Sequence, residues 1–485
     1  MRTLDLSVLV LYLIGITLFG ARFRGSQKTL KDYFLGGRTT PWWAIAFSIV
    51  SAETSTLTVI GTPGRSFAGN FGFLQVVLGY LFARIVISTL FLPLYFRGEM
   101  YTAYELMQRR FGQSIRRFTA GSFLALRAMA EGVRVFAISI VVSIMLGTDG
   151  FWSIVIIVAL TLVYTFEGGM TAVIWTDVVQ MFLYVAGAIL SLFVILGKIP
   201  GGWDHVQTAA LAADKFKVFD FRFDWSAEFF TRPYSFWAGV IGGCFLTTAS
   251  HGTEQLMVQR LLSARNERES RWALMASWAV ILFQFTLFLV IGLILWVYYA
   301  DNNLAAPKQA DRIYPEFIWN SLPHGIAGLI MAAILAAAMS NLSAALNSLA
   351  STTIMDFYKP MSPNRTESHY LRLAKLATLF WGVVLFLIGL VSQGVPSVLE
   401  AGLSIASVIY GGLLGVFLLG RLTERVGERA AILGMAAGLA IVLYIYFFTK
   451  IAWTWYVLTG SGVTFATGYI ASFVIPEKVR KEQHV

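Results

Sequence analysis

The sequence predicts an all-α protein that crosses a membrane about thirteen times, and three observations lead to this fold class. Of the 485 residues, 57% are hydrophobic and only 13% are charged, about half the charged fraction of a soluble protein. Apolar stretches long enough to span a bilayer follow one another along the whole chain. Lysines and arginines gather in alternate loops between these stretches, which indicates membrane topology rather than a nucleic-acid-binding stripe.

A membrane-spanning helix needs about 20 apolar residues. The segments that meet this length are, within a few residues, 5–21, 41–62, 72–96, 118–146, 150–166, 174–197, 234–252, 272–299, 323–357, 371–392, 396–420, 428–449 and 451–475. The first is followed by the basic stretch RFRGSQKTLK and by no cleavage site, so we expect a helix that is retained. The longest loop, 198–233, is too short for an ordinary soluble domain, so we treat 1–485 as one membrane domain.

Basic residues set the expected orientation of these helices. They cluster at 22–38, 97–117, 260–271, 359–375, 421–429 and 478–481. Because lysine and arginine are enriched in cytoplasmic loops, we expect the N-terminus outside and the C-terminus inside the plasma membrane, here the inner membrane of a bacterium. The one cysteine, Cys244, excludes a disulfide within the chain and a cysteine-cluster metal site.

Two of the apolar segments contain features that break a helix. Segment 41–62 includes FSIVSAETSTLTV, with hydroxyl side chains at mid-span, and segment 234–252 includes GGCFLTTASHG. Polar groups and breaks are costly inside a bilayer and persist mainly where they line a cavity or an ion path. Interrupted helices at matching places in two halves indicate an inverted-repeat transporter. We therefore predict repeats at 41–197 (helices 2–6) and 234–420 (helices 7–11), with helices 1, 12 and 13 peripheral.

The ninth segment is rich in small and hydroxyl side chains, in the stretch MAAILAAAMSNLSAALNSLAS at 331–351. At 100° per residue, one face of this helix holds Ala337, Ser340, Ser343, Ala344, Asn347 and Ser351. One interpretation is close helix packing, with the serine hydroxyls bonded back to their own helix. The other is a site for a monovalent cation, where these hydroxyls meet carbonyls that a neighbouring break has freed.

The fourth segment carries charge in the stretch LRAMAEGVRVF, which places Arg127, Glu131 and Arg134 at positions i, i+4 and i+7. One interpretation is an internal salt bridge, Arg127–Glu131 or Glu131–Arg134, that satisfies buried charge. The other is that Arg134 holds a substrate carboxylate through a bidentate fork.

The chain resembles the sodium:solute symporter family over nearly its whole length. The motifs that carry the resemblance are DYFLGGR (32–38), YTAYELMQRRFG (101–112), FEGGMTAVIWTDVVQ (166–180), EQLMVQRLLSARN (254–266) and NLSAALNSLASTTIMDFY (341–358), in family order and at family spacing. The resemblance implies a LeuT-like five-plus-five inverted repeat. It also implies sodium-coupled import of a small polar organic solute by alternating access, with Na⁺ as the coupling ion and no organic cofactor.

The resemblance implies sodium ligands as well. The main site would consist of the carbonyls of Ser51, Thr54 and Ala337, the Ser340 hydroxyl, and Asn341, where many relatives have a second serine. A second sodium, present in some relatives, would use Asp177, Ser340 and Ser343, with Ala344 where another serine would stand. The alternative for Asp177 is a helix N-cap formed together with Thr176.

The solute is expected at the midplane between the two breaks. On the resemblance, the candidate contacts are Ser55, Thr58, Phe73, Gln75, Arg134, Ser250, His251 and Gln255. Sugar carriers have a tryptophan and a tyrosine where this chain has Ser250 and His251, which argues against a glucose-like sugar. The arginines favour an organic anion, while a sugar, a polyol and an amino acid stay open.

Three other hypotheses compete with sodium symport. A proton-coupled carrier on the same fold would use Glu53, Asp177 or Glu254. A solute sensor would need a signalling domain, which the short stretch after 475 argues against. A membrane enzyme would need a metal cluster or a nucleophile with its base, and since His251 and Glu254 are the only plausible pair, we expect no enzyme. The expected partners are a small solute and the bilayer, with no nucleic acid and a monomer as the transport unit.

Overall fold

The computed structural model describes residues 2–22, 38–97, 103–164, 170–362, 364–475 and 477. Within these ranges the chain is helical, apart from turns, loops and one isolated parallel bridge between Thr40 and Ala264. Ten of the described helices are long and apolar enough to cross a membrane, or eleven if the bent pair α3 (Trp42–Glu53) and α4 (Thr56–Ala68) is one span. The two other predicted segments form the shorter helices α9 (Gly150–Tyr164) and α13 (Phe236–Gly252).

The remaining helices follow the predicted order. The first part of the chain contains α1 (Thr3–Ala21), α5 (Leu74–Val86), a π-helical turn (Ile87–Phe91), α6 (Leu92–Tyr95), α7 (Ala103–Arg110), α8 (Gln113–Leu146) and α10 (Met170–Gly197). The long loop after α10 contains α11 (Gly202–Ala212) and α12 (Ala227–Thr231). The second part contains α14 (Gln255–Leu262), α15 (Glu267–Asp301), η4 (Ala310–Arg312), α16 (Ile313–Ser321), α17 (Ile326–Thr352), η5 (Thr353–Tyr358), α18 (Lys359–Met361), α19 (Glu367–Val391), α20 (Val398–Leu422), α21 (Glu428–Phe448) and α22 (Tyr456–Val474).

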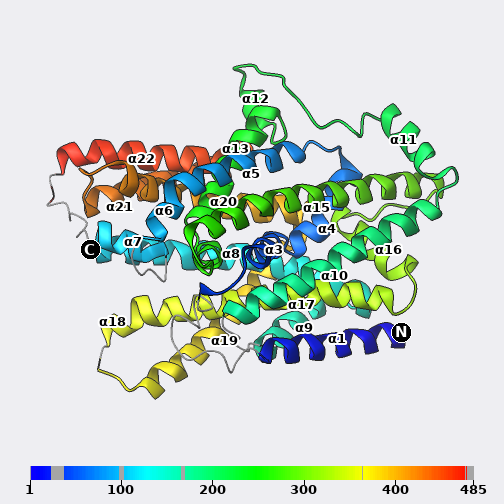
Figure 1. The fold of residues 1–485 in the computed structure, drawn as a ribbon, viewed down its shortest axis with the longest axis horizontal. Coiled ribbons are helices and arrows are strands. Elements are labelled where there is room, and N and C mark those ends of the chain that lie inside the picture. The colour runs from blue at the N-terminus through cyan, green and yellow to red at the C-terminus, as the bar shows by residue number, and fades with distance from the viewer. Residues whose placement is uncertain are drawn as a thin grey trace.

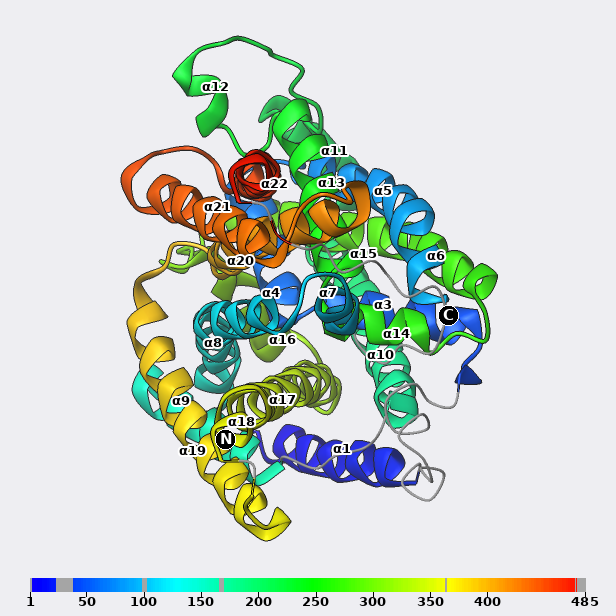
Figure 2. The same cartoon turned by 90° about the vertical axis from the view of Figure 1, so that its left-hand side faces the viewer.

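The long helices lie side by side along the length of the molecule (Figure 1). Viewed along them, α17 lies among α1, α8, α9, α10 and α19, and it packs against all five (Figure 2). Helix α15 packs against both halves of the bent pair, and α5 packs against α13. A Cβ atom added at Gly239 of α13 would lie 2.8 Å from the Cβ of Gln75, so this close approach of α5 requires glycine.

We call the side that holds the start of α1 the outer side, following the orientation expected from the basic residues. There Asp5 of α1 fixes the start of α17, since its Oδ1 accepts hydrogen bonds from the backbone N–H groups of Gly325 (2.7 Å) and Gly328 (2.9 Å). A carboxylate at this position satisfies N–H groups that have no partner inside the helix. At the opposite edge, α21 and α22 pack against each other and against α20. The repeat boundaries, 41–197 and 234–420, stay a prediction.

Candidate functional site

The first break lies between α3 and α4, which meet at a bend of 64°. Ser55 there has an extended backbone, with φ −79° and ψ 174°. Its N–H donates to the Glu53 carbonyl (3.2 Å), and the Thr58 N–H donates to the Ser55 carbonyl (2.9 Å). The carbonyls of Ser51 and Thr54 therefore lose the donor that a continuous helix would supply four residues later. These are the two backbone carbonyls of the first break that the family resemblance implies as sodium ligands.

The second break follows α13, where the chain turns at Thr253 and Glu254 before α14 begins at Gln255. Helix α13 continues through the paired glycines and ends at Gly252, so the break lies just after Ser250 and His251. The sequence thus predicts this interruption to within a few residues.

A charged cluster at the first break reaches the end of α13. Glu53, the last residue of α3, accepts a hydrogen bond from Arg84 Nη2 of α5 at 2.8 Å. His251 Nε2 of α13 lies 3.4 Å from the same carboxylate, and His251 Nδ1 lies 2.8 Å from the Ser250 hydroxyl. Arg84 is fully buried and also donates to Ser277 and to backbone carbonyls. The candidates Ser250 and His251 therefore belong to one charged network with the first break.

A second charged network contains the predicted stack of helix α8. Arg127 and Arg134 both pair with Glu131 Oε1, at 3.0 and 2.7 Å, so both predicted salt bridges form. Arg127 also pairs at 2.6 Å with Glu254 at the second break, and Glu254 accepts a hydrogen bond from the Tyr410 hydroxyl of α20. The sequence did not predict these longer-range partners.

Arg134 differs from the other charged groups of this network in its exposure. Its side chain is 28% exposed although it lies on a long helix in the interior of the bundle, whereas Glu131 is fully buried. Of its guanidinium nitrogens, Nη1 bonds to Glu131, and the structure shows no partner for Nε or Nη2 among the described residues. Because a guanidinium has five N–H donors, this side chain keeps a free edge for a carboxylate.

The polar lining near the first break includes residues that the sequence did not single out. The Thr54 hydroxyl donates to Gln284 Oε1 of α15 at 3.1 Å. The Tyr184 hydroxyl of α10 lies beside Ser51, Thr54 and Gln284. It is buried without a hydrogen bond of ordinary geometry, as is Gln284 Nε2. Such unpartnered polar atoms are expected where an ion or a water molecule completes the coordination.

Helix α17 carries an accessible stripe on an otherwise buried helix. Ala337, Asn341 and Ser348 are half-buried and Ala344 is exposed, whereas most of their neighbours on α17 are buried. The spacing of four, three and four residues keeps these positions on one face. Figure 2 shows α17 among α1, α8, α9, α10 and α19, the five helices against which it packs. Among the described residues, no hydrogen bond joins Ser51 or Thr54 to this stripe, and the side chain of Ser340 lies outside the described residues.

The structure corrects one interpretation of Asp177. This residue lies about two turns inside α10, so the N-cap alternative with Thr176 is wrong. Its carboxylate instead accepts hydrogen bonds from the Ser48 hydroxyl (2.7 Å) and from Arg260 Nη2 of α14 (3.0 Å). Ser343, the other described member of the second sodium set, is buried on α17. An arginine thus already provides Asp177 with a positive charge.

The other substrate candidates fall into two groups. Ser55 and Thr58 are buried at the first break, and Gln255 begins the helix after the second. Phe73 and Gln75 lie farther out, where Phe73 stacks on Phe285 with centroids 5.1 Å apart. The Gln75 amide donates to the carbonyls of Gly72 and Tyr234 and accepts from the Asp220 N–H, so it holds the long outer loop. The structure brings the first group to the breaks but not Phe73 and Gln75.

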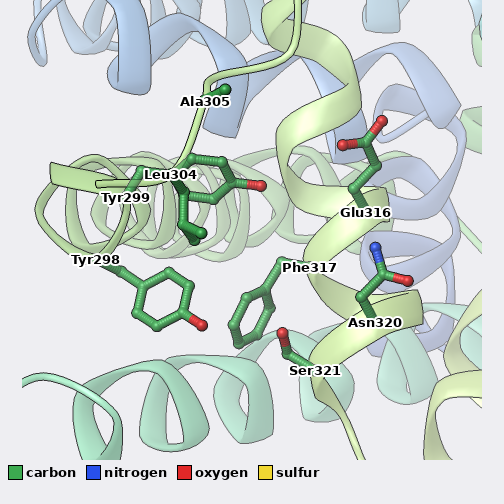
Figure 3. A pocket seen from close by; sticks show the side chains of 8 residues that line it. All are labelled: Tyr298, Tyr299, Leu304, Ala305, Glu316, Phe317, Asn320 and Ser321. Carbon is green, nitrogen blue, oxygen red and sulfur yellow. The ribbon is translucent and has the colours of Figure 1, made fainter. Parts of the chain in front are cut away.

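A cavity of about 250 Å³ lies apart from these networks, between the outer end of α15 and α16 (Figure 3). Tyr298, Tyr299, Glu316, Phe317 and Asn320 are among the residues that line it. None of the predicted site residues lines it, so it carries no argument about the solute site.

Comparison of the sequence with those of known proteins identifies one family of membrane transporters. A family-wide sequence model described as "Sodium:solute symporter family" matches residues 33–438. The sodium/sialic acid symporter NanT of Aliivibrio fischeri is 28% identical over 99% of this chain and 95% of its own length. The human sodium/iodide cotransporter is 27% identical over 90% of this chain and 68% of its own length.

Solved structures give the same comparison for the fold. A Na⁺-coupled sialic acid symporter in a substrate-bound outward-open state superposes with a TM-score of 0.82, at 28% identity and over 98% of this chain and 99% of that one. Mhp1, a nucleobase-cation-symport-1 family transporter, superposes with a TM-score of 0.52 at 13% identity over 91% of this chain and 93% of that one, which is a likeness of fold alone.

Proposed function

Because this chain belongs to the sodium:solute symporter family, we propose that it is a sodium-coupled symporter that imports a small organic anion by alternating access. The observation that carries the proposal is the first break, where the bend frees the Ser51 and Thr54 carbonyls beside a buried, incompletely bonded Tyr184. Neutral oxygens in such a setting suit a monovalent cation, since Ca²⁺ sites usually contain carboxylates.

We place the coupling sodium between the first break and the accessible stripe of α17. The ligands would be the carbonyls of Ser51, Thr54 and Ala337, the Ser340 hydroxyl and the Asn341 amide oxygen. Binding would draw α17 toward the α3–α4 bend and so order the broken helix for the solute. By linkage, sodium and solute then raise each other's affinity by the same factor.

We propose a single coupling ion. The second set contains Asp177, Ser340 and Ser343, but Asp177 is paired with Arg260 and Ala344 has no oxygen to offer on its side chain. Sodium entry is driven by its gradient and by the membrane potential, which contributes about 2.3 kcal/mol per charge for each 100 mV.

We propose Arg134 as the group that recognises the solute, with Ser250 and His251 on the α13 side. The free edge of the Arg134 guanidinium supports an anionic solute. The network is neutral before the anion binds, because its two positive and two negative side chains balance: Arg127 and Arg134, Glu131 and Glu254. Relatives of this chain include carriers of sialic acid and of monocarboxylates, solutes that bear a carboxylate. The solute would thus be a small carboxylate with polar substituents.

The test is the melting temperature of the purified protein with a panel of carboxylates, sugars, polyols, amino acids and nucleosides, in NaCl and in KCl of equal ionic strength. A ligand that binds only the folded state raises stability by RT ln(1 + [L]/Kd). We expect a carboxylate to raise the melting temperature in sodium but not in potassium. Equal shifts in both salts that follow pH would refute sodium coupling in favour of protons, and a shift with uncharged solutes alone would refute the carboxylate.

A further inference from the structure

The outer loop between α11 and α13 exposes a row of aromatic side chains. Phe219, Phe221, Phe223 and Trp225 are 45%, 61%, 52% and 82% exposed, and Trp237 in the first turn of α13 is 38% exposed. We call these five residues the aromatic rim. In an extended segment alternate side chains point to one side, which explains the spacing of two residues. Exposed apolar patches of this kind are rare on surfaces that face only water.

The charged residues between and just after the rim positions form two ion pairs. Arg222 pairs with Asp220 at 2.6 Å, and Arg232 pairs with Asp224 at 2.6 Å. The hydrogen bond from Arg222 lowers the pKa of Asp220 to about 2, so this pair stays charged and paired at neutral pH. With Glu228 added to these two pairs, the segment from 219 to 232 presents its aromatic rings with a net charge of only −1.

The rim continues the lipid-facing surface of the bundle. Phe221 packs on Phe236 with ring centroids 4.8 Å apart, and Phe223 packs on Trp237 with ring centroids 5.7 Å apart. Phe236 and Trp237 both lie in the first turn of α13. From Trp237 the accessible residues of α13 run inward along one apolar face through Ile241, Cys244 and Phe245. Since α13 starts at the outer side, its first turn lies at the level where a bilayer meets water.

The position of the loop places the rim beside the bundle rather than over its outer end. In Figure 1, α12 and the segment that leads to it lie beyond the edge formed by α13 and α22. In the view along the helices they again lie outside the perimeter of the bundle (Figure 2). A backbone hydrogen bond from the Ala452 N–H to the Phe230 carbonyl (2.8 Å) holds α12 to the loop before α22. The space around this perimeter is occupied by lipid in a membrane protein.

We propose that the aromatic rim inserts into the headgroup boundary of the outer leaflet and anchors this loop to the bilayer. Aromatic rings are favoured at that depth because they combine apolar area with a tolerance for polar surroundings. The anchored segment also holds the first transport helices, since the Asp220 N–H donates to Gln75 Oε1 and the Phe71 N–H donates to the Lys217 carbonyl. Lipid contact would thereby reach the start of α5, next to the outer half of the first broken helix.

The test uses spin labels in lipid nanodiscs. With Cys244→Ala as background, single labels are placed at Trp225→Cys and Phe221→Cys, and at Gln207→Cys on exposed α11 as a matched control in the same loop. We expect the ratio of oxygen to nickel-complex collisions at 225 and 221 to exceed that at 207 by at least about threefold, since oxygen concentrates in lipid. The measurement needs neither sodium nor solute, so it is independent of the proposed transport.

Two outcomes would overturn the proposal. Ratios at 225 and 221 equal to that at 207 would place the rim in water. Low collision rates with both reagents, together with label-to-label distances below about 20 Å between protomers, would assign the rim to contact with a second copy of the chain. Unchanged melting temperatures of the labelled variants in detergent confirm that each remains folded.

Discussion

At each break a glutamate pairs with an arginine of a neighbouring helix, but the surroundings of the two pairs differ. The pairs are Glu53 with Arg84 and Glu254 with Arg127. Arg84 is completely buried, and its other bonds go to backbone carbonyls of α15 and α5 and to the buried Ser277 hydroxyl of α15. Arg127 instead continues through Glu131 to the accessible Arg134. The first break is therefore held by a closed network, and the second by one with an open end.

On the proposed function, the two networks would serve two different tasks of a sodium-coupled carrier. A closed network keeps the bend of α3 and α4 in place, so that the carbonyls freed there stay available to an ion. On the proposed function, the network with the accessible arginine would change when an anion binds to the free edge of the Arg134 guanidinium. The contact between Glu53 and His251 links the first network to the end of α13, just before the second break. The first two predictions below each alter one network and leave the other intact, and the last two concern α17 and the outer half of the first broken helix.

The largest effect is expected from Arg84→Met. It removes the arginine that pairs with the largely buried Glu53 carboxylate, and removing one partner of a buried ion pair costs about 3–5 kcal/mol. We expect a large fall in melting temperature in detergent. The matched control is Arg271→Gln, which removes the exposed pair with Glu267 and should cost less than about 1 kcal/mol. Recovery of most of the stability in Glu53→Gln/Arg84→Met would support the pairing, and equal loss in R84M and R271Q would contradict it.

The second prediction concerns the open end of the other network. Arg134→Gln should weaken binding of a carboxylate solute by about tenfold to a hundredfold, because hydrogen bonds to charged groups contribute about 1.5–3 kcal/mol. The melting temperature without solute should change little, since Arg127 still neutralises Glu131. Arg134→Lys keeps the charge but not the fork and should lie between. Unchanged solute affinity in R134Q would show that the open end does not receive the anion.

The sequence predicts the part of the second network that lies within one helix. Arg127, Glu131 and Arg134 are spaced so that neighbouring turns bring them together, and both pairs form. The positions of both breaks also follow from local chemistry, since hydroxyl-rich and glycine-rich stretches weaken a helix in a bilayer. The sequence does not predict the contacts between helices, because the partner of a buried charge depends on how distant segments pack.

Three pairs illustrate what the sequence leaves open. Glu53 and Arg84 are 31 residues apart, Asp177 and Arg260 are 83 apart, and Glu254 and Tyr410 are 156 apart. An arginine in an apolar segment, such as Arg84, does indicate that some buried acid must lie nearby. Which acid it is depends on helix packing that no periodicity encodes. The N-cap interpretation of Asp177 failed for a related reason, since apolar composition does not mark where α10 begins.

The third prediction concerns the sodium site proposed beside the first break. Ser340→Ala should raise the half-saturating sodium concentration by about tenfold, equal to about 1.4 kcal/mol for one lost ligand. Asn341→Ser, which restores the serine common among relatives, should change it less. Ser348→Ala, at a half-buried position farther along α17, is the matched control and should leave the sodium dependence unchanged. The measurement is sodium-dependent uptake in proteoliposomes, and normal sodium dependence in S340A would refute the site.

The smallest effect concerns the outer half of the first broken helix, which is closed against η4 and the start of α20. Asp311 of η4 accepts a hydrogen bond from the Val398 N–H at 2.9 Å. A Cβ at Gly61 of α4 would lie 3.4 Å from its Oδ1. Glu400 is the nearby acid, itself held by Tyr234 (2.6 Å) and Arg65 (3.6 Å). Burial, with a smaller contribution from Glu400, raises the pKa of Asp311 from 3.8 to about 6.

The raised pKa sets the direction of the pH effect on this closure. Because burial favours the protonated acid, the closed arrangement gains stability that is fully present below pH 3.8 and is lost as the pH rises through about 6. We expect a cysteine at Thr62, in the Cys244→Ala chain, to react with a maleimide a few times faster at pH 7.5 than at pH 5, after division by the rate at Gln207→Cys. Asp311→Asn stays neutral at every pH and should remove this dependence. If D311N shows the same pH dependence of labelling, a group other than Asp311 controls the closure of the outer half of the first broken helix. The first break would then be less tightly closed than the buried Arg84 indicates.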